Sequence, residues 1–346
     1  MKRWQLWLGL LISAVFVWIA LRGLELGQVW EYLTEANYWW LVPSVVTYFV
    51  AVWARTWRWD YMLRPVKKIP VRRLFPVVVI GYMGNNVYPF RAGEVLRSYV
   101  LRQREAVPMS ASLATVIVER VFDGLVMLLF VFVALPITPI PSENIRLLVI
   151  VASLGFFGAM ILFFALAAVP DRAYRLADWA GNIFLPYRAR DPLLEFTQRF
   201  LDGLESLRHF HNVLMIFITS VVIWLLETVK YWFVMHAFEF EVSFFALMLM
   251  NGVVNLATTI PSAPGYVGTF DVPGIGVLQL YGIQKEIASA YTLVLHAALW
   301  LPVTLLGAFY MLREGLGWSD FGQAAALAEN EQETATAEPA QSEAPV

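Results

Sequence analysis

VVVIGYMGNNVYPFRAGEVLR, residues 77–97, is apolar enough to enter a bilayer but breaks at proline and glycine before it could cross one. A second stretch, LMLMNGVVNLATTIPSAPGYVGTFD at residues 247–271, has the same order of features. Each runs from apolar residues through Asn into Pro-x-x-x-Gly, at Pro89 to Gly93 and at Pro261 to Gly265. A crossing helix needs about 20 mostly apolar residues. The apolar parts, roughly 74–90 and 244–260, therefore predict broken or re-entrant helical segments.

Six other stretches are long and apolar enough to cross a membrane as helices. They cover roughly residues 4–21, 38–54, 113–135, 146–169, 213–238 and 287–312. Hydrophobic residues make up 59% of the chain and charged residues 15%, against about 45–50% and about 25% in soluble domains. The sequence therefore predicts an all-α polytopic membrane protein with about six full transmembrane helices and two Pro/Gly-broken re-entrant hairpins. A net charge of −2 gives no sign of nucleic-acid binding.

Positive charge predicts the orientation, because Lys and Arg in short loops stay on the cytoplasmic side. Lys2 and Arg3 place the N-terminus inside, and no signal-peptide cleavage site follows the first apolar run, so we interpret that run as a retained helix. Two further basic loops are expected in the cytoplasm, one with Arg55, Arg58, Arg64, Lys67, Lys68, Arg72 and Arg73, the other with Arg172, Arg175, Arg188, Arg190, Arg199 and Arg208. We expect a multi-pass protein of the cell inner membrane with both termini cytoplasmic. The membrane domain would cover residues 1–318, and a disordered cytoplasmic tail residues 319–346.

This topology makes the two broken segments an inverted repeat, with a first unit at about 38–135 and a second at about 213–312. The first hairpin enters from the cytoplasm and the second from the exterior. Irregular backbone at membrane depth is tolerated only inside protein or beside a wet cavity, so the two breaks should face each other. Helix N-termini near Ala92 and Thr269 would then present positive dipole ends to an anionic headgroup. The alternative is a chance match, since Pro and Gly are common in membrane helices.

Ionisable residues inside a membrane segment usually face the bundle interior and are paired. Glu119 and Asp123 are four residues apart in the third predicted span, where like charges repel unless a cation lies between them. We expect a buried ionic network that joins Arg91, Glu94 and Arg97 to Glu119, Arg120 and Asp123. The network could simply pin the hairpin, or it could leave one arginine to pair with a lipid phosphate.

Other polar residues give weaker signals. Glu227 and Lys230, three apart in the fifth span, are either a structural pair or part of a substrate or proton path. His236 and His296 are interpreted as packing residues, and His209 with His211 lack a metal-site spacing. The chain has no cysteine, no P-loop and no Gly-x-Ser-x-Gly elbow. No metal, cofactor or enzymatic activity is therefore expected.

Three motifs resemble the lysylphosphatidylglycerol synthase transmembrane family, also described as flippase-like, over about residues 5–315. They are Asn85-x-x-x-Pro89-x-Arg91-x-Gly93-Glu94-x-x-Arg97, Glu119-Arg120-x-x-Asp123, and Pro261-x-x-Pro264-Gly265-x-x-Gly268. The resemblance implies a lipid-handling membrane domain, which in larger relatives moves aminoacylated phosphatidylglycerol between leaflets after a separate cytoplasmic domain makes it. Two departures are the absence of a comparable catalytic domain after the last span and Asp271, where many relatives are expected to have Glu.

The residues and the resemblance together predict a lipid flippase or transporter for an anionic phospholipid or polyprenyl-phosphate lipid. The alternatives are a non-catalytic membrane subunit that scaffolds a lipid synthase or glycosyltransferase, and a lipid-modifying enzyme related to aminoacyl-phosphatidylglycerol synthases. The predicted substrate-binding residues are Asn85, Arg91, Glu94, Arg97, Glu119, Arg120, Asp123, Glu227, Lys230 and Asp271. The predicted structural breaks are Pro89, Gly93, Pro261, Pro264, Gly265 and Gly268. The expected partner is a membrane lipid with an anionic headgroup, and the sequence does not indicate an oligomeric state.

Overall fold

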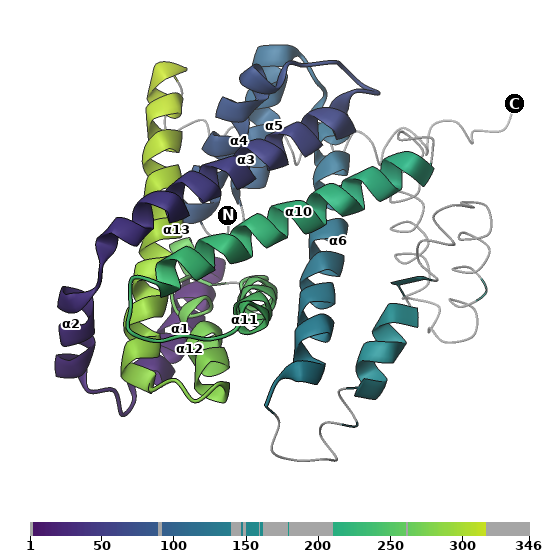
Figure 1. The fold of residues 1–346 in the computed structure, drawn as a ribbon. Helices are drawn as coiled ribbons and strands as arrows, with labels where there is room; N and C mark the ends of the chain where they lie inside the picture. The colour runs from purple at the N-terminus through teal and green to yellow at the C-terminus, as the bar shows by residue number, and fades with distance from the viewer. Residues whose placement is uncertain are drawn as a thin grey trace, which may run out of the picture.

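The computed structural model describes residues 3–88, 92–139, 147, 150–158, 160–161, 179, 210–260 and 262–315, and its described elements are all helical (Figure 1). Its principal helices are α1 (Arg3–Leu21), α2 (Leu26–Glu35), α3 (Leu41–Leu63), α4 (Val71–Val87), α5 (Ala92–Glu105), α6 (Met109–Ala134), α10 (Phe210–Met235), α11 (Phe244–Ala257), α12 (Asp271–Leu280) and α13 (Lys285–Arg313). A 3₁₀ turn, η3 (Pro264–Tyr266), precedes α12. The prediction of an all-α chain is confirmed for these ranges. Pro89, Arg91, Pro261, His209, most of the span predicted at 146–169 and the tail at 319–346 lie outside the described residues.

Within the described ranges, two helices are long and apolar enough to cross a membrane, at His211–Met235 and Lys285–Arg313. A third candidate is bent by 87° between Leu10–Leu21 and Leu26–Glu35. The second part of that pair is α2, which buries Val29 and exposes Leu26 and Trp30. The sequence interpretation placed α2 in a connection and missed it as a helix. The number of full spans stays a prediction.

Each broken segment forms a pair of packed helices, and the two pairs lie at opposite ends of the bundle (Figure 1). In the first, α4 packs on α5 through glycines, and a Cβ added at Gly93 would lie 1.9 Å from the carbonyl oxygen of Gly81 and 2.5 Å from the backbone nitrogen of Asn85. In the second, α11 packs on α12, where a Cβ at Gly274 would lie 2.7 Å from Met250 Cε. Gly93, which the sequence predicted to be a break, is instead the second residue of α5, and its missing side chain lets two backbones touch.

The long helices pair reciprocally between the two predicted repeat units. Helix α4 of the first unit packs on α13 of the second, α11 packs on α6, and α3 packs on α10. Gly307 of α13 faces Met83 and the Val79 carbonyl of α4, while Gly252 of α11 faces the Met127 carbonyl of α6. Two apolar cores result, one around α4 and α5 and the other around α11 and α12. Exchanging the two units preserves this pairing, as a twofold relation would require, and the inverted repeat itself stays a prediction.

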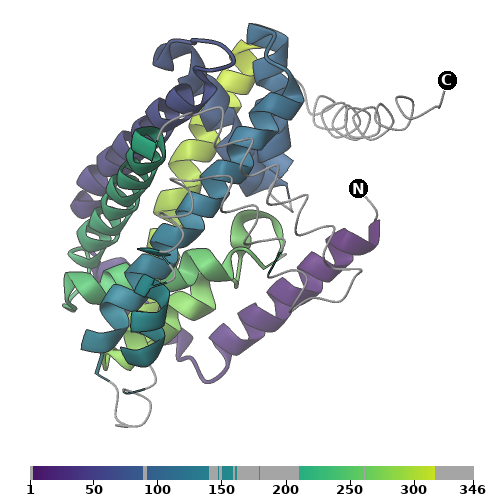
Figure 2. The ribbon, with the colours of Figure 1, turned by 90° about the vertical axis from the view of Figure 1, so that its right-hand side faces the viewer.

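Helix α1 slants away from the other helices (Figure 2). It is attached at the break of the second hairpin, where Ser13 Oγ accepts a 2.8 Å hydrogen bond from the Ala263 backbone N–H. Gly268, at φ 83°, lies against the same helix, and a Cβ there would approach Phe16 Cβ to 2.6 Å. This glycine therefore serves both a left-handed turn and a close helix contact.

Candidate functional site

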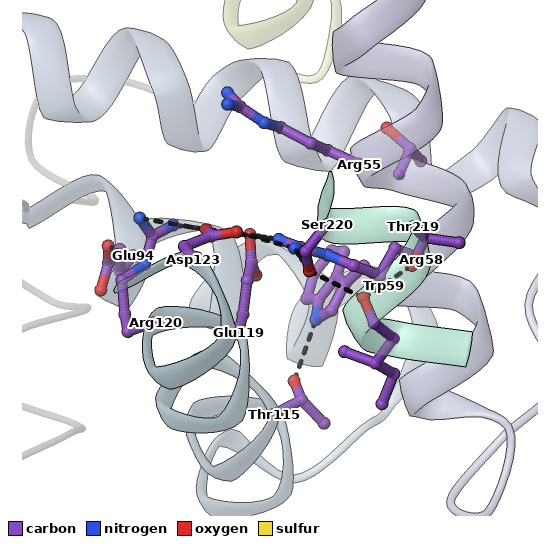
Figure 3. A network of polar contacts seen from close by, with 12 residues as sticks. Arg55, Arg58, Trp59, Glu94, Thr115, Glu119, Arg120, Asp123, Thr219 and Ser220 are labelled. Carbon is purple, nitrogen blue, oxygen red and sulfur yellow. Dashed lines mark hydrogen bonds and ion pairs between the residues drawn. The ribbon is translucent and has the colours of Figure 1, made fainter. Parts of the chain in front are cut away.

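A buried ionic network surrounds Glu119 and Asp123, one turn apart on α6 (Figure 3). Arg58 of α3 lies between the two carboxylates, 3.0 Å from Glu119 and 2.7 Å from Asp123. Arg97 of α5 binds the other oxygen of Glu119 at 2.6 Å. Both carboxylates and both guanidiniums are almost fully buried. The cation needed to hold two neighbouring carboxylates together is therefore an arginine side chain of the protein itself.

Arg120 connects this network to the first hairpin. Its guanidinium lies 3.1 Å from Glu94, 3.4 Å from Glu119 and 3.7 Å from Asp123. Its side chain is 30% exposed, against 5% or less for Arg58 and Arg97. The structure thus brings together five of the six residues expected in the network, and the sixth, Arg91, lies outside the described residues. Arg120 is the network cation best placed to meet a ligand.

The sequence interpretation was wrong about Arg55 and Arg58, which it assigned to a cytoplasmic loop. Helix α3 continues to Leu63 and buries both side chains. The missed signal is a spacing of three and four residues through Tyr48, Val52, Arg55, Trp59 and Met62, all buried. An apolar face that continues past the first arginine indicates a continuing helix rather than a loop.

A second buried ion cluster lies where α3 meets α10. Glu227 pairs with Lys230 on its own helix and with Arg55 at 3.2 Å. The Arg55 guanidinium also lies 4.8 Å from the centre of the Trp224 ring, and Trp224 Nε1 donates to Asp123 at 3.0 Å. The two clusters are therefore joined through one tryptophan. Glu227 and Lys230 do pair, and Arg55 is a third member that sequence reasoning missed.

The sequences around this second cluster are similar in the two units. Residues 55–59 read RTWRW on α3 and residues 227–231 read ETVKY on α10. Arg55 and Glu227 hold the same place in these two short sequences and form an ion pair with each other. Such a meeting of corresponding positions is what a twofold relation between α3 and α10 would produce. This repeat was a readable signal for Arg55.

At the second hairpin, the first residue of α12 pairs with α13. Asp271 Oδ1 lies 2.9 Å from His296 Nδ1, while His296 Nε2 lies 2.7 Å from the Gly265 carbonyl oxygen. His296, interpreted as a packing residue, thus has a polar partner at each ring nitrogen. His236 contacts a carbonyl of its own helix and packs at a tilt against the rings of Trp232 and Trp40, as a packing residue does.

The two hairpins meet at a cavity of about 140 Å³. Its wall includes Asn85 and Asn86 of α4, Asn255 of α11 with Thr258 directly after that helix, and Gly265 and Tyr266 of η3. Trp300 of α13 contacts both hairpins. Its Nε1 donates to the Asn86 carbonyl at 3.3 Å, and a Cβ at Gly265 would lie 3.0 Å from the same nitrogen.

Charged side chains from three helices complete the cavity wall. The cations are Arg55, Arg120 and Lys230, and the carboxylates are Asp123 and Glu227, which leaves one excess positive charge. Glu94 and Arg97 line only a much smaller adjacent hollow of about 10 Å³. Neither cavity includes Glu119, Asp271, Pro264 or Gly268 in its lining. The arrangement can hold an anion among three cations while the surrounding carboxylates keep those cations in place.

Comparisons with known proteins agree on a membrane protein. The model of one family, the lysylphosphatidylglycerol synthase TM region, matches residues 6–307. A UPF0104 membrane protein of Methanothermobacter thermautotrophicus is 25% identical over 87% of this chain and 90% of its own length. A UPF0104 membrane protein of Methanocaldococcus jannaschii is 20% identical over 88% of this chain and 93% of its own length. The glycosyltransferase AglD of Haloferax volcanii is 25% identical over 86% of this chain, which spans 52% of that relative. No solved structure matches the chain significantly.

Proposed function

Because the chain belongs to the family of the lysylphosphatidylglycerol synthase transmembrane region, we propose that it moves a lipid with an anionic headgroup between the two leaflets of a membrane. The headgroup is that of an anionic phospholipid or a polyprenyl phosphate. The protein acts without chemical change to the lipid, in the cell membrane, with both termini in the cytoplasm.

The cavity between the hairpins carries this proposal. Its volume of about 140 Å³ is roughly ten times the minimum of about 10–15 Å³ that one water molecule needs. A phosphate-sized headgroup fits in it, and the acyl or prenyl chains stay in the bilayer. The excess positive charge of the wall favours an anion, and guanidinium groups suit phosphate because they donate two parallel hydrogen bonds.

The position of the cavity supports movement between leaflets rather than simple binding. Transporters built from inverted repeats place their substrate site where interrupted helices of both units meet, and rocking of one unit against the other opens the site to each side in turn. Here α4 of the first hairpin and η3 of the second are in contact, and both supply wall residues. A headgroup held between them would need to shift only a short distance to leave on either side.

Replacing Lys230 with methionine tests the site. Glu227 keeps its partner Arg55 at 3.2 Å, so no carboxylate is left unpaired, while the cavity wall loses one of its positive charges. We expect leaflet exchange to slow about tenfold or more, since the headgroup loses one hydrogen bond to a charged group. The measurement is leaflet exchange of a fluorescent phosphatidylglycerol in liposomes that contain the purified chain.

Two variants control this measurement. Lys230→Arg keeps the charge and is expected to retain exchange, and Lys67→Met removes a cation that pairs with Glu105 away from the cavity. Exchange by Lys230→Met at the wild-type rate would exclude this cavity as the headgroup site.

A second candidate is a membrane subunit that scaffolds a glycosyltransferase or lipid synthase. The relative named glycosyltransferase AglD favours it, since this chain matches only about half of that protein. A scaffold would give no leaflet exchange on its own and would co-purify with a partner enzyme. A lipid-modifying enzyme would instead leave a covalently altered lipid after incubation with the chain alone, which mass spectrometry detects.

A further inference from the structure

His296 lies between two acceptor oxygens. Its Nδ1 is 2.9 Å from Asp271 Oδ1, and its Nε2 is 2.7 Å from the carbonyl oxygen of Gly265. A carbonyl oxygen cannot donate, and an ionised carboxylate cannot donate either. A neutral imidazole has one N–H and one bare nitrogen. In that form one of the two contacts would place lone pairs against each other at hydrogen-bond distance.

One additional proton resolves this conflict. An imidazolium donates to both oxygens, and a protonated Asp271 that donates to a neutral ring does the same with an identical number of protons. Asp271 Oδ2 accepts the Gly268 N–H at 2.8 Å at the N-terminus of α12, where the helix dipole stabilises negative charge. The Asp271 carboxylate therefore stays ionised, and the additional proton belongs on His296.

This proton allows His296 of α13 to hold η3, the turn at the break of the second hairpin. Gly265 adopts φ 75° in η3, and its carbonyl reaches α13 through His296. The ring of Phe270 lies 4.5 Å from the imidazole and covers one of its faces. If the ring is neutral and keeps its bond to Asp271, the Gly265 carbonyl loses its donor. That carbonyl is then the contact most readily released.

The pair of His296 and Asp271 lies beside the cavity that the buried ions also line. His296 is part of the cavity wall, and the side chains of His296 and Asp271 are 14% and 19% exposed. The other charged or titratable groups on that wall are Arg55 of α3, Arg120 and Asp123 of α6, Glu227 and Lys230 of α10, and the tyrosines at 48, 82, 231 and 266. Asp123 and Glu227 already have cationic partners. Asp271 is the carboxylate in direct contact with the histidine.

We propose that His296 and Asp271 form a proton-binding site that couples lipid movement to a proton gradient. A bound proton holds the η3 turn against α13, and its release through the cavity frees the turn. This inference rests on the proposed transport function and names its coupling ion. Protonation and headgroup binding then act on one wall of one cavity.

Hydrogen exchange of residues 262–270, followed by mass spectrometry and corrected for the intrinsic effect of pH, tests the site without any transport. Wild-type protein in detergent is compared from about pH 5 to about pH 9, to favour the added proton at the low end and its loss at the high end. We expect protection of this segment to fall about tenfold or more as pH rises, the change that corresponds to losing a charge-assisted hydrogen bond.

Asp271→Asn is the matched variant. Its amide N–H₂ donates to a neutral His296, its amide oxygen still accepts from Gly268, and His296 Nε2–H still donates to Gly265, so all three bonds persist without an additional proton. The segment is expected to stay protected at every pH in this variant and to be unprotected at every pH in His296→Ala. A flat wild-type profile, or the same pH dependence in Asp271→Asn, would overturn the proton site.

Liposomes with an imposed pH gradient test the coupling. Wild-type exchange of fluorescent phosphatidylglycerol should depend on the gradient, and exchange by Asp271→Asn should not. A gradient-independent wild-type rate overturns the coupling and leaves the transport function intact. If the protein moves no lipid but hydrogen exchange of residues 262–270 still depends on pH, the proposed function is wrong and the proton site remains.

Discussion

Replacing Gly93 with alanine is expected to prevent the first hairpin from closing. The added Cβ would lie 1.9 Å from the Gly81 carbonyl oxygen and 2.5 Å from the Asn85 backbone nitrogen. Both are backbone atoms of α4, so no side-chain rotation can relieve the contact, and the two helices must separate. We expect a loss of at least about 3 kcal/mol in the free energy of unfolding, the upper end of what overpacking usually costs.

Gly276→Ala is the matched control for this change. Gly276 lies in α12 of the second hairpin, and a Cβ there meets nothing within 4 Å. Alanine at an open helical site favours folding by roughly 0.5–1 kcal/mol. Thermal unfolding in detergent should therefore separate the two variants in opposite directions. Equal melting temperatures would show that α4 and α5 are not packed as closely as described.

Replacing Glu119 with glutamine is the second change with a large expected effect. Glu119 supplies a carboxylate to Arg58 at 3.0 Å and to Arg97 at 2.6 Å, and all three side chains are nearly inaccessible to solvent. A neutral amide cannot balance two buried guanidiniums. Removing one partner of a buried ion pair costs about 3–5 kcal/mol, so we expect a comparable decrease in stability, measured by thermal unfolding monitored by size-exclusion chromatography.

Glu239→Gln provides the control, since Glu239 lies exposed between α10 and α11 and its substitution should leave the melting temperature nearly unchanged. If Glu119→Gln and Glu239→Gln melted at the same temperature, the buried network would contribute little to stability. Arg58 and Arg97 would then need other counter-ions. The comparison also separates the two interpretations of the network. Stability depends on Glu119, whereas the headgroup is expected to meet Arg120, Arg55 and Lys230.

The two hairpins were predictable from sequence because proline and glycine interrupt otherwise apolar runs. The helices on either side of these interruptions pack as pairs, α4 with α5 and α11 with α12. The part of the network on α6 was predictable too, since the spacing of Glu119 and Asp123 fixes them on one face of a helix. In each case the signal is local, and local spacing determines which side chains share a surface.

Arg55 and Arg58 were missed for a physical reason. Basic residues after an apolar run commonly mark a cytoplasmic loop. The apolar spacing that continues to Met62 indicates a helix, but the partners that bury the two arginines lie on α6 and α10, far away in the sequence. The contact between Asp271 and His296 spans 25 residues and two helices, so no local pattern indicates it. Long-range pairing of opposite charges was therefore the information that the sequence alone did not supply.

The central claim is that the two broken hairpins enter the membrane from opposite faces and meet at one charged cavity. The chain has no cysteine, so single cysteines at Lys68, before α4, and at Gln284, before α13, are unique labels on exposed positions at the bases of the two hairpins. A membrane-impermeant thiol reagent is applied to oriented vesicles. We predict labelling of Lys68→Cys from the cytoplasmic side only and of Gln284→Cys from the exterior only, and labelling of both from the same side would contradict the account.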